Sequence, residues 1–326
     1  VMQFSSKMGD VLIRLAKEAD LPAILEMSKG IYRDNDYFPG EFLNYLKDSS
    51  RRILIAVKDD RAVGLQVIHI IDEGETAIVQ ALRVHLSYRR QGIGKRLIEE
   101  CRNYVKENFP QVKFERYSVN SQSKARLGIQ KKSNDVIFHT VVFFACVVNG
   151  NASKLNSRFA SYLSDQYADL KYLSKIEFES VLSQGDIDHI LFKGKYIVLW
   201  QPFKALVSNL QNGLFKDGDS IYASYSGDSI ESLSHARWCP IEICPQLFTV
   251  FYTLDEQLLK AHFRQQIENA MLQHPGETFL FVPVIDTSLA PCASQLLLND
   301  LLLKNIKEDV GTQAYYDLHL VEKSLA

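Results

Sequence analysis

The chain has 326 residues, 46% of them hydrophobic and 11% aromatic, which suffices for one large domain or two ordinary domains with apolar cores. Its formal net charge of −2 excludes the overall positive field of a nucleic-acid-binding protein, so we expect no nucleic-acid partner. The longest apolar run, Val136 to Val148, is too short to span a bilayer, and no targeting segment is recognisable, so we expect no membrane partner.

The cysteines favour a reducing compartment. There are five, an odd number, and they are scattered rather than spaced as a disulfide framework. His235, Cys239 and Cys244 lie close in sequence, but their spacing matches no standard zinc pattern. We therefore expect a cytoplasmic protein without a bound metal.

Hydrophobic periodicity over the first 150 residues predicts a series of strands and helices. A strand is followed by two helices, three strands, a helix, a strand, a helix and a last strand. The expected ranges are 11–16, 20–31, 42–46, 53–57, 63–71, 76–84, 92–108, 112–119, 120–132 and 136–148. The helix that begins at 92 starts within the most informative stretch of the chain.

That stretch, Arg89 to Lys95, reads Arg-Arg-Gln-Gly-Ile-Gly-Lys and lies where a predicted strand ends and a predicted helix begins. Gly92 and Gly94 permit a tight turn that exposes backbone N–H groups. The helix start adds unpaired amides and the positive end of the helix dipole. The combination predicts a pyrophosphate site, and the basic side chains around it add positive charge.

Two common glycine loops do not fit this stretch. A P-loop needs four residues between its glycines and a Ser or Thr after its lysine, whereas Arg96 follows Lys95. A dinucleotide-binding loop needs a third glycine, where Leu97 stands, and a glycine turn directly after the strand. The pyrophosphate is therefore expected to belong to another kind of ligand.

The loop resembles the Arg/Gln-x-x-Gly-x-Gly/Ala pattern of the GNAT acetyltransferases, matched here as Arg89-x-x-Gly92-x-Gly94. Upstream, Leu82-Arg83-Val84 resembles the Leu-x-Val strand end of that family. The predicted element order is also similar to the GNAT order. The resemblance implies a GNAT fold, of the α/β (α+β) class with a mixed central sheet and flanking helices, over residues 10–150.

A narrower resemblance concerns the histidine N-acetyltransferase group and its N-acetyltransferase relatives. It rests on the runs Ala23–Ser28, Ile31-Tyr32 and Asp36–Pro39, and on Asp72–Thr76 before the strand that leads to the loop. The resemblance implies an amino acid acceptor, with histidine favoured. Nothing in the residues themselves singles out histidine.

The GNAT resemblance implies direct acetyl transfer from acetyl-CoA to an amine in a ternary complex. Backbone groups at the strand end would hold the pantetheine arm and the thioester carbonyl, in the manner of an oxyanion hole, and the loop would hold the pyrophosphate. The residues expected to bind acetyl-CoA are Leu82, Arg83, Val84, Arg89, Arg90, Gln91, Gly92, Ile93, Gly94, Lys95, Asn120 and Ser123.

The catalytic base is not evident from the sequence. Alternation places Gln80 on one strand face with Leu82 and Val84, where GNAT enzymes often carry a glutamate. A glutamine can orient an amine or a water molecule but cannot accept a proton. Glu75, at the start of the strand, is the nearest carboxylate, and a solvated acidic turn is its alternative interpretation.

The catalytic acid is also in doubt. Many GNAT enzymes protonate the leaving thiolate with a tyrosine, and counting the family pattern from Asn120 puts Leu127 in that position. Tyr117 and water remain as possible donors, and an impaired enzyme is the third interpretation.

The acceptor pocket of this fold is closed by the segment between the first two helices, where Tyr32, Asp36, Tyr37 and Phe38 are expected to bind the substrate. Aromatic rings can stack on a flat side chain, and an aspartate can hold a cation. The alternative is that Tyr37 and Phe38 form the hydrophobic start of the second helix.

Residues 155–326 are expected to form a C-terminal α/β lobe without a glycine loop. A predicted β-α-β-α-β series over 248–321 repeats the second half of the first domain, and residues 208–238, rich in Ser, Gly and Asp, are predicted to be loops. The lobe is interpreted either as a degenerate second GNAT-like domain that has lost cofactor binding or as an unrelated extension.

Three functions remain open at this point. The first is a small-molecule N-acetyltransferase, the second is a peptide or protein N-acetyltransferase, and the third is a regulatory protein that binds acetyl-CoA without transferring it. The sequence leaves the oligomeric state open.

Overall fold

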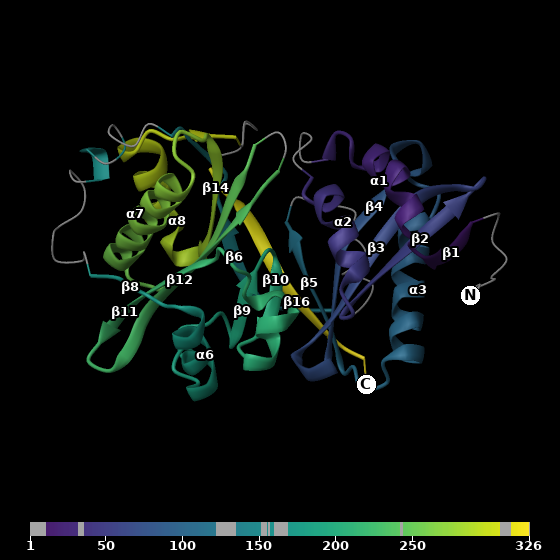
Figure 1. Ribbon diagram of the computed structural model, residues 1–326, viewed down its shortest axis with the longest axis horizontal. Coiled ribbons are helices and arrows are strands. Elements are labelled where there is room, and N and C mark those ends of the chain that lie inside the picture. Colours follow the sequence, from purple (N-terminus) through teal and green to yellow (C-terminus); the bar gives the residue numbers. More distant parts are fainter. Residues whose placement is uncertain are drawn as a thin grey trace. The chain divides into compact units, whose positions relative to one another are not determined.

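The computed structural model describes residues 11–31, 36–121, 135–150, 155, 157–159, 169–241, 244–306 and 314–325 (Figure 1). By their contacts these residues form two compact units. The first unit comprises residues 11–117, 135–136 and 322–325, and the second comprises the described residues from 118–121 and 137–321.

The first unit contains a mixed sheet in the order β1-β2-β3-β4-β5, antiparallel except for the parallel pair β4–β5. Its described elements are β1 (Leu12–Leu15), α1 (Leu21–Ser28), α2 (Phe38–Lys47), β2 (Arg51–Lys58), β3 (Arg61–Ile71), β4 (Thr76–Val84), α3 (Ile93–Asn108) and β5 (Phe114–Asn120). The predicted order of elements is thus confirmed up to β5.

Different helices cover the two faces of this sheet (Figure 1). α3 buries an apolar stripe that includes Ile93, Leu97 and Cys101 against one face. α1 and α2 cover the other face with residues such as Ile24 and Phe42. The stripe follows helical spacing and the strands alternate, so each strand has one side chain row toward α3 and one toward α1 and α2.

The second unit contains a mixed sheet in the order β8-β11-β12-β13-β14-β6, in which only β13 and β14 are parallel among the described pairs. Its described elements are β6 (Val136–Phe143), β7 (Cys146–Val148), β8 (Lys171–Tyr172), α6 (Lys175–Gln184), β9 (Lys195–Val198), β10 (Gln201–Lys204), β11 (Ser220–Ser226), β12 (Ser229–Cys239), β13 (Gln246–Tyr252), α7 (Glu256–Gln273), β14 (Phe279–Asp286), α8 (Ala290–Ser294), β15 (Lys304–Asn305) and β16 (Tyr316–Ser324).

Both faces of β13 are covered. α7 packs on one face through a cluster that includes Phe251 and Phe263. The β9–β10 hairpin lies on the other, where the ring of Tyr196 is 5.0 Å from that of Tyr252. Residues 247 and 251 therefore face α7, and residues 248 and 252 face the hairpin, as strand alternation requires.

The structure corrects the single strand predicted over 136–148. It consists of β6 and β7, which pair with different parts of β14 on either side of Pro283. Proline has no N–H to donate to a ladder, and a break in the partner strand accommodates it. Because both strands pair with β14, they belong to the second unit rather than to a first domain ending at 150.

The structure also corrects the loops predicted over 208–238. Residues 220–226 and 229–239 form the β11–β12 hairpin, and most of its serines are buried. Ser224, Ser232 and Ser234 are satisfied by hydrogen bonds to one another or to His262 of α7. A segment rich in small polar residues predicts loops, whereas here these side chains line a buried polar layer.

Candidate functional site

β4 is bulged near its carboxyl end. Arg83 pairs with Leu65 and Gln80 pairs with Val67, so Ala81 and Leu82 together lie opposite a single residue of β3. Ala81 has a φ of 54°, in the left-handed region. A β-bulge of this kind bends the strand and takes backbone groups out of the ladder.

The bulge reverses the alternation of β4. Leu82 and Val84 pack on the α3 side, whereas Arg83 reaches Asp36 at the start of α2. The prediction that Gln80 shares a face with Leu82 and Val84 is therefore wrong. The period of two on which it relied holds only for a strand without an extra residue.

β4 and β5 separate before the bulge. Within the described residues their parallel register covers Thr76–Ile78 opposite Phe114–Arg116, and no β5 partner pairs with Val79 to Leu82. The edge of β4 next to the bulge is thus open to an extended ligand. This geometry agrees with the predicted use of the strand end for a pantetheine arm and a thioester carbonyl.

The glycine loop lies between β4 and α3, as predicted. Arg90 and Gly92 have φ values of 63° and 80°, and Gly92 is the residue before the first turn of α3. No side chain caps this helix start, and a Cβ at Gly92 would have no heavy atom within 4 Å. The loop therefore offers amide donors, the positive helix end and open space to an anion.

Side chains hold the loop from several directions. Arg89 Nε donates to the carbonyl of Val84 (3.0 Å), and Gln91 Nε2 donates to the carbonyl of Ser87 (3.3 Å). Lys58 Nζ, from the β2–β3 turn, donates to Gln91 Oε1 (3.3 Å). Sequence reasoning missed Lys58, because the contact joins residues far apart in the chain and no local motif marks it.

The remaining loop residues have different environments. Ile93 is buried under the sheet, so it positions the loop through packing. Gly94 faces Val84 and Leu82, at 3.6 and 3.9 Å from where its Cβ would lie, so a Cβ there would make ordinary van der Waals contact with β4. Lys95 is exposed and lies 3.6 Å from Glu99 on the same helix.

Gln80 directly precedes the bulge. The residue is half-buried, and among the described residues its buried Nε2 has no hydrogen-bond partner. An unsatisfied buried donor is costly unless a ligand completes it. This placement suits a residue that orients an oxygen of the substrate or of a water molecule.

Glu75 lies at the opposite end of β4. Its carboxylate pairs with Lys113, and its backbone carbonyl accepts hydrogen bonds from Lys113 and Phe114. It lies six positions before Ala81 in the sequence, which corresponds to about 20 Å along a strand. This position argues against Glu75 as a base for chemistry at the bulge.

Tyr117 is buried in β5, and its hydroxyl donates to Asp135 Oδ2 (2.6 Å). A phenol that already donates to a carboxylate is a weak candidate for protonating a thiolate. Asn120 ends β5, while Ser123 and Leu127 lie outside the described residues. A role for these residues remains a prediction.

The predicted acceptor residues have different environments. Asp36 is buried and pairs with Arg83, and its Oδ1 also accepts a hydrogen bond from the backbone N–H of Phe38 (3.2 Å). Phe38 is fully buried, with its ring centroid 6.1 Å from that of Phe42, which argues against direct contact with an acceptor. Tyr37 is half-buried at the same helix start, and Tyr32 lies outside the described residues.

The second unit contains the same β-α-β arrangement in β13, α7 and β14, but it lacks the features of the site. Five consecutive pairs join β13 to β14, from Gln246–Leu280 to Val250–Val284, so these strands stay paired over a longer stretch than β4 and β5 and part only at the last two residues of β13. Only Thr253 to Asp255 connect β13 to α7. Asp255 Oδ1 accepts hydrogen bonds from the N–H groups of Gln257 (2.7 Å) and Leu258 (2.8 Å), so a carboxylate already occupies the helix start.

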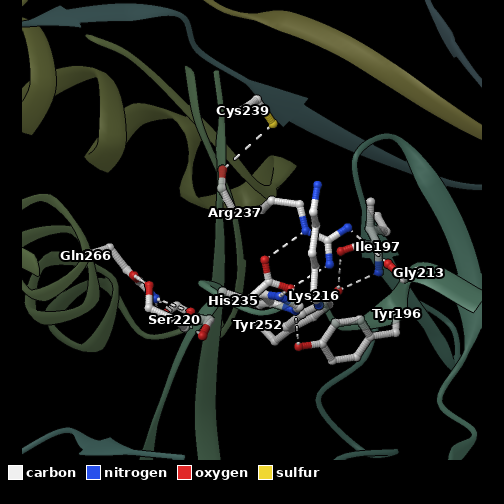
Figure 2. A network of polar contacts seen from close by, with 12 residues as sticks. Tyr196, Ile197, Gly213, Lys216, Ser220, His235, Arg237, Cys239, Tyr252 and Gln266 are labelled. Atoms are coloured by element: carbon white, nitrogen blue, oxygen red, sulfur yellow. Dashed lines mark hydrogen bonds and ion pairs between the residues drawn. The ribbon is translucent and has the colours of Figure 1, made fainter. Parts of the chain in front are cut away.

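A buried polar network lies between the β9–β10 hairpin and β12 (Figure 2). Arg237 Nε (2.8 Å) and His235 Nε2 (2.9 Å) contact Asp219, and Tyr196 of the β9–β10 hairpin contacts His235 Nδ1 (3.0 Å). Burial alone would raise the pKa of Asp219, but the hydrogen bonds of Arg237 and His235 outweigh it and lower that pKa to about 2. The network fixes the hairpin on the sheet.

A bulged fourth strand that separates from the fifth, followed by an uncapped glycine turn and a helix, defines the first unit as an acetyltransferase domain of the GNAT fold. Residues 21–124 match the acetyltransferase (GNAT) family, and residues 166–285 match the family described as histidine N-acetyltransferase, C-terminal. The chain is thus similar to the GNAT acetyltransferases over the first of these stretches and to the C-terminal region of histidine N-acetyltransferases over the second.

Curated relatives agree with both matches. The chain is 28% identical over 233 residues to histidine N-acetyltransferase from Oreochromis niloticus, covering 67% of each chain. It is 28% identical over 229 residues to histidine N-acetyltransferase from Scomber australasicus, again with 67% of each covered. Probable N-acetyltransferase 16 from Homo sapiens is 28% identical over 208 residues, covering 60% of this chain and 54% of that protein.

Solved structures show the same fold. A tandem GNAT protein from the clavulanic acid biosynthesis pathway has a TM-score of 0.60 at 11% identity, covering 97% of this chain and 98% of that one. A GCN5-related N-acetyltransferase from Sphaerobacter thermophilus has a TM-score of 0.59 at 10% identity, covering 98% and 97%. The tandem structure fits a second GNAT-like lobe in this chain.

No described helix is both long and apolar enough to cross a membrane. The described part of the chain contains no group of three His, Cys, Asp or Glu side chains placed to hold a metal ion.

Proposed function

We propose that this chain is an acetyl-CoA-dependent N-acetyltransferase that acetylates the amino group of an amino acid, with histidine as the favoured acceptor. The observation that carries the proposal is the bulge of β4 next to the uncapped start of α3. The names of the relatives support the choice of acceptor. A cytoplasmic location, expected from the scattered cysteines, belongs to the same proposal.

The chain's own residues account for binding and orientation. Amides of the loop around Gly92 hold the pyrophosphate, and the open edge of β4 at Ala81 holds the pantetheine arm and the thioester carbonyl. Acetyl-CoA supplies the activated acetyl group. Holding donor and acceptor together then replaces an encounter in solution by an oriented reaction.

Asp36, the carboxylate next to the bulge, is paired with Arg83, so we assign the proton transfer without a carboxylate of the protein. Gln80 orients the acceptor or a water molecule through its Nε2, and the acceptor amine loses its proton to water. Glu75 is too far along β4 to serve there, and Tyr117 is engaged with Asp135. The mechanism therefore relies on positioning more than on acid–base groups of the protein.

We further propose that acetyl transfer is confined to the first unit. In the second unit the β13–β14 pairing and the Asp255 carboxylate occupy the places that the pantetheine arm and the pyrophosphate would need. This supports its interpretation as a degenerate GNAT-like lobe.

The acceptor is tested by measuring release of free CoA thiol from acetyl-CoA with the twenty amino acids, several biogenic amines and short peptides. We expect turnover with histidine or another single amino acid. Turnover only with peptides would favour the peptide or protein acetyltransferase. Acetyl-CoA binding by calorimetry without turnover on any amine would favour a regulatory protein, an alternative that Gln80 at the bulge motivates.

A further inference from the structure

Arg83 and Asp36 form a buried ion pair next to the bulge. Arg83 Nε donates to Asp36 Oδ2 (3.1 Å), and Nη2 donates to Oδ1 (2.8 Å). The two side chains are only 7% and 2% exposed. Desolvating two charges offsets much of their attraction, so such a pair is weak evidence of a purely stabilising role.

The position of Arg83 is defined by the bulge. It is two residues beyond Ala81, which corresponds to about 7 Å along the strand. Its side chain points to the α1 and α2 face, whereas its neighbours Leu82 and Val84 point to α3. Arg83 therefore places a guanidinium on the face of Gln80, within side-chain reach of the proposed thioester position.

Asp36 holds this guanidinium in one orientation. Its carboxylate contacts the Nε–Nη2 edge of Arg83 and is itself fixed by the backbone N–H of Phe38 in the first turn of α2. Asp36 thus takes one bidentate edge of the guanidinium, and a second carboxylate would meet the Nη1–Nη2 edge, where Nη1 also donates to the carbonyl of Leu82 (3.4 Å).

An amino acid acceptor requires such a group. Its carboxylate is separated from the attacking amine by a single carbon, so both lie near the thioester at the moment of attack. A carboxylate in a buried site needs a charged or hydrogen-bonding partner. An amine without a carboxylate has no such requirement.

We infer that Arg83 recognises the α-carboxylate of the acceptor and so selects amino acids over simple amines, with Asp36 as the residue that positions it. The inference rests on the proposed function. One guanidinium holds two carboxylates elsewhere in this unit, where Arg116 pairs with both Asp72 and Glu322. Engagement with Asp36 is therefore compatible with binding a second carboxylate.

The test compares kcat/KM for histidine and for histamine, which is histidine without the carboxylate. Wild type is measured beside Arg83→Gln, Arg83→Lys and the control Arg264→Gln, an arginine of α7 that pairs with Glu268 on the surface. Acetyl-CoA affinity by calorimetry checks that each variant is folded. The ratio of the two kcat/KM values is the readout, because a merely structural defect lowers both.

We expect Arg83→Gln to reduce the histidine-to-histamine ratio by about 10- to 150-fold, the range for a lost hydrogen bond to a charged group. The ratio for Arg83→Lys should lie between those of wild type and Arg83→Gln, because lysine keeps the charge but not the bidentate geometry. Arg264→Gln should leave the ratio unchanged. The inference also requires wild type to prefer histidine to histamine, which can be measured even if the Arg83 variants do not fold.

An unchanged ratio in a folded Arg83→Gln enzyme that still acetylates histidine would overturn the inference and leave the proposed function standing. Equal kcat/KM values of wild type for histidine and histamine would also overturn the inference and leave the proposed function standing. Absence of turnover with every amino acid would overturn the proposed function, and the inference with it.

Discussion

At the scale of single residues, Gln80 distinguishes this site most clearly. It directly precedes the bulge, where a carboxylate would act as a base, and among the described residues its Nε2 has no hydrogen-bond partner. We propose that a glutamine there positions the acceptor without taking its proton. The sequence identified Gln80 but could not place it, because the face of a strand residue depends on a bulge that alternation does not reveal.

The pH dependence of wild type and Gln80→Glu tests this assignment. Without a protein base, kcat/KM for the amino acid should rise with pH until the amino group of the acceptor is neutral. Gln80→Glu supplies a base, so the rise should move to lower pH. Gln80→Ala is the control and should lower the rate without moving the profile. Identical profiles for wild type and Gln80→Glu would contradict the positioning role.

At the scale of elements, α3 connects the parallel strands β4 and β5, and α7 connects the parallel strands β13 and β14. The two helices are buried in different ways. α3 covers its sheet with apolar residues such as Ile93 and Leu97, which is why helical periodicity predicted it well. α7 instead places His262 and Gln266 against serines of β11 and β12. Composition suggested loops for those strands, because polar residues reveal burial only once their partners are known.

His262 makes the second unit sensitive to acid. Burial lowers its pKa to about 3, and its Nε2 and Nδ1 lie 2.8 and 2.7 Å from the hydroxyls of Ser232 and Ser234. The unfolded chain takes up this proton near pH 6.5, so the stabilising contribution is complete above pH 6.5 and is lost progressively as pH falls toward 3. The free energy of unfolding should fall by about 2 kcal/mol between pH 6.5 and 5.

Urea unfolding followed by tryptophan fluorescence measures this loss, because both tryptophans, Trp200 and Trp238, lie in the second unit. His262→Gln, which keeps a polar side chain but does not titrate, is the comparison. Its stability should change less than that of wild type over the same pH interval. Equal losses in the two proteins would assign the acid sensitivity to other groups.

At the scale of the whole molecule, the two units differ at corresponding positions. In the first unit no side chain of the N-cap residue caps the start of α3, and among the described residues β4 is unpaired with β5 beyond Ile78. In the second unit Asp255 caps the start of α7, and β13 is paired with β14 as far as Val250. The resemblance in the glycine loop predicted the first part, and the family matches agree with it. The sequence did not decide whether the second lobe is a degenerate GNAT-like domain or an unrelated extension. The distinction depends on the strand register of β13 and β14 and on the cap formed by Asp255, which only the folded chain displays.

Calorimetric titration of the full chain with acetyl-CoA tests the central claim most directly. We predict one site per chain, abolished in Gly92→Glu by charge repulsion and loss of open space, and retained in Gly227→Glu. Gly227 is a matched control, because its φ of 62° is also positive and a Cβ there also has nothing within 4 Å. Two sites per chain, or unchanged binding in Gly92→Glu, would contradict the account.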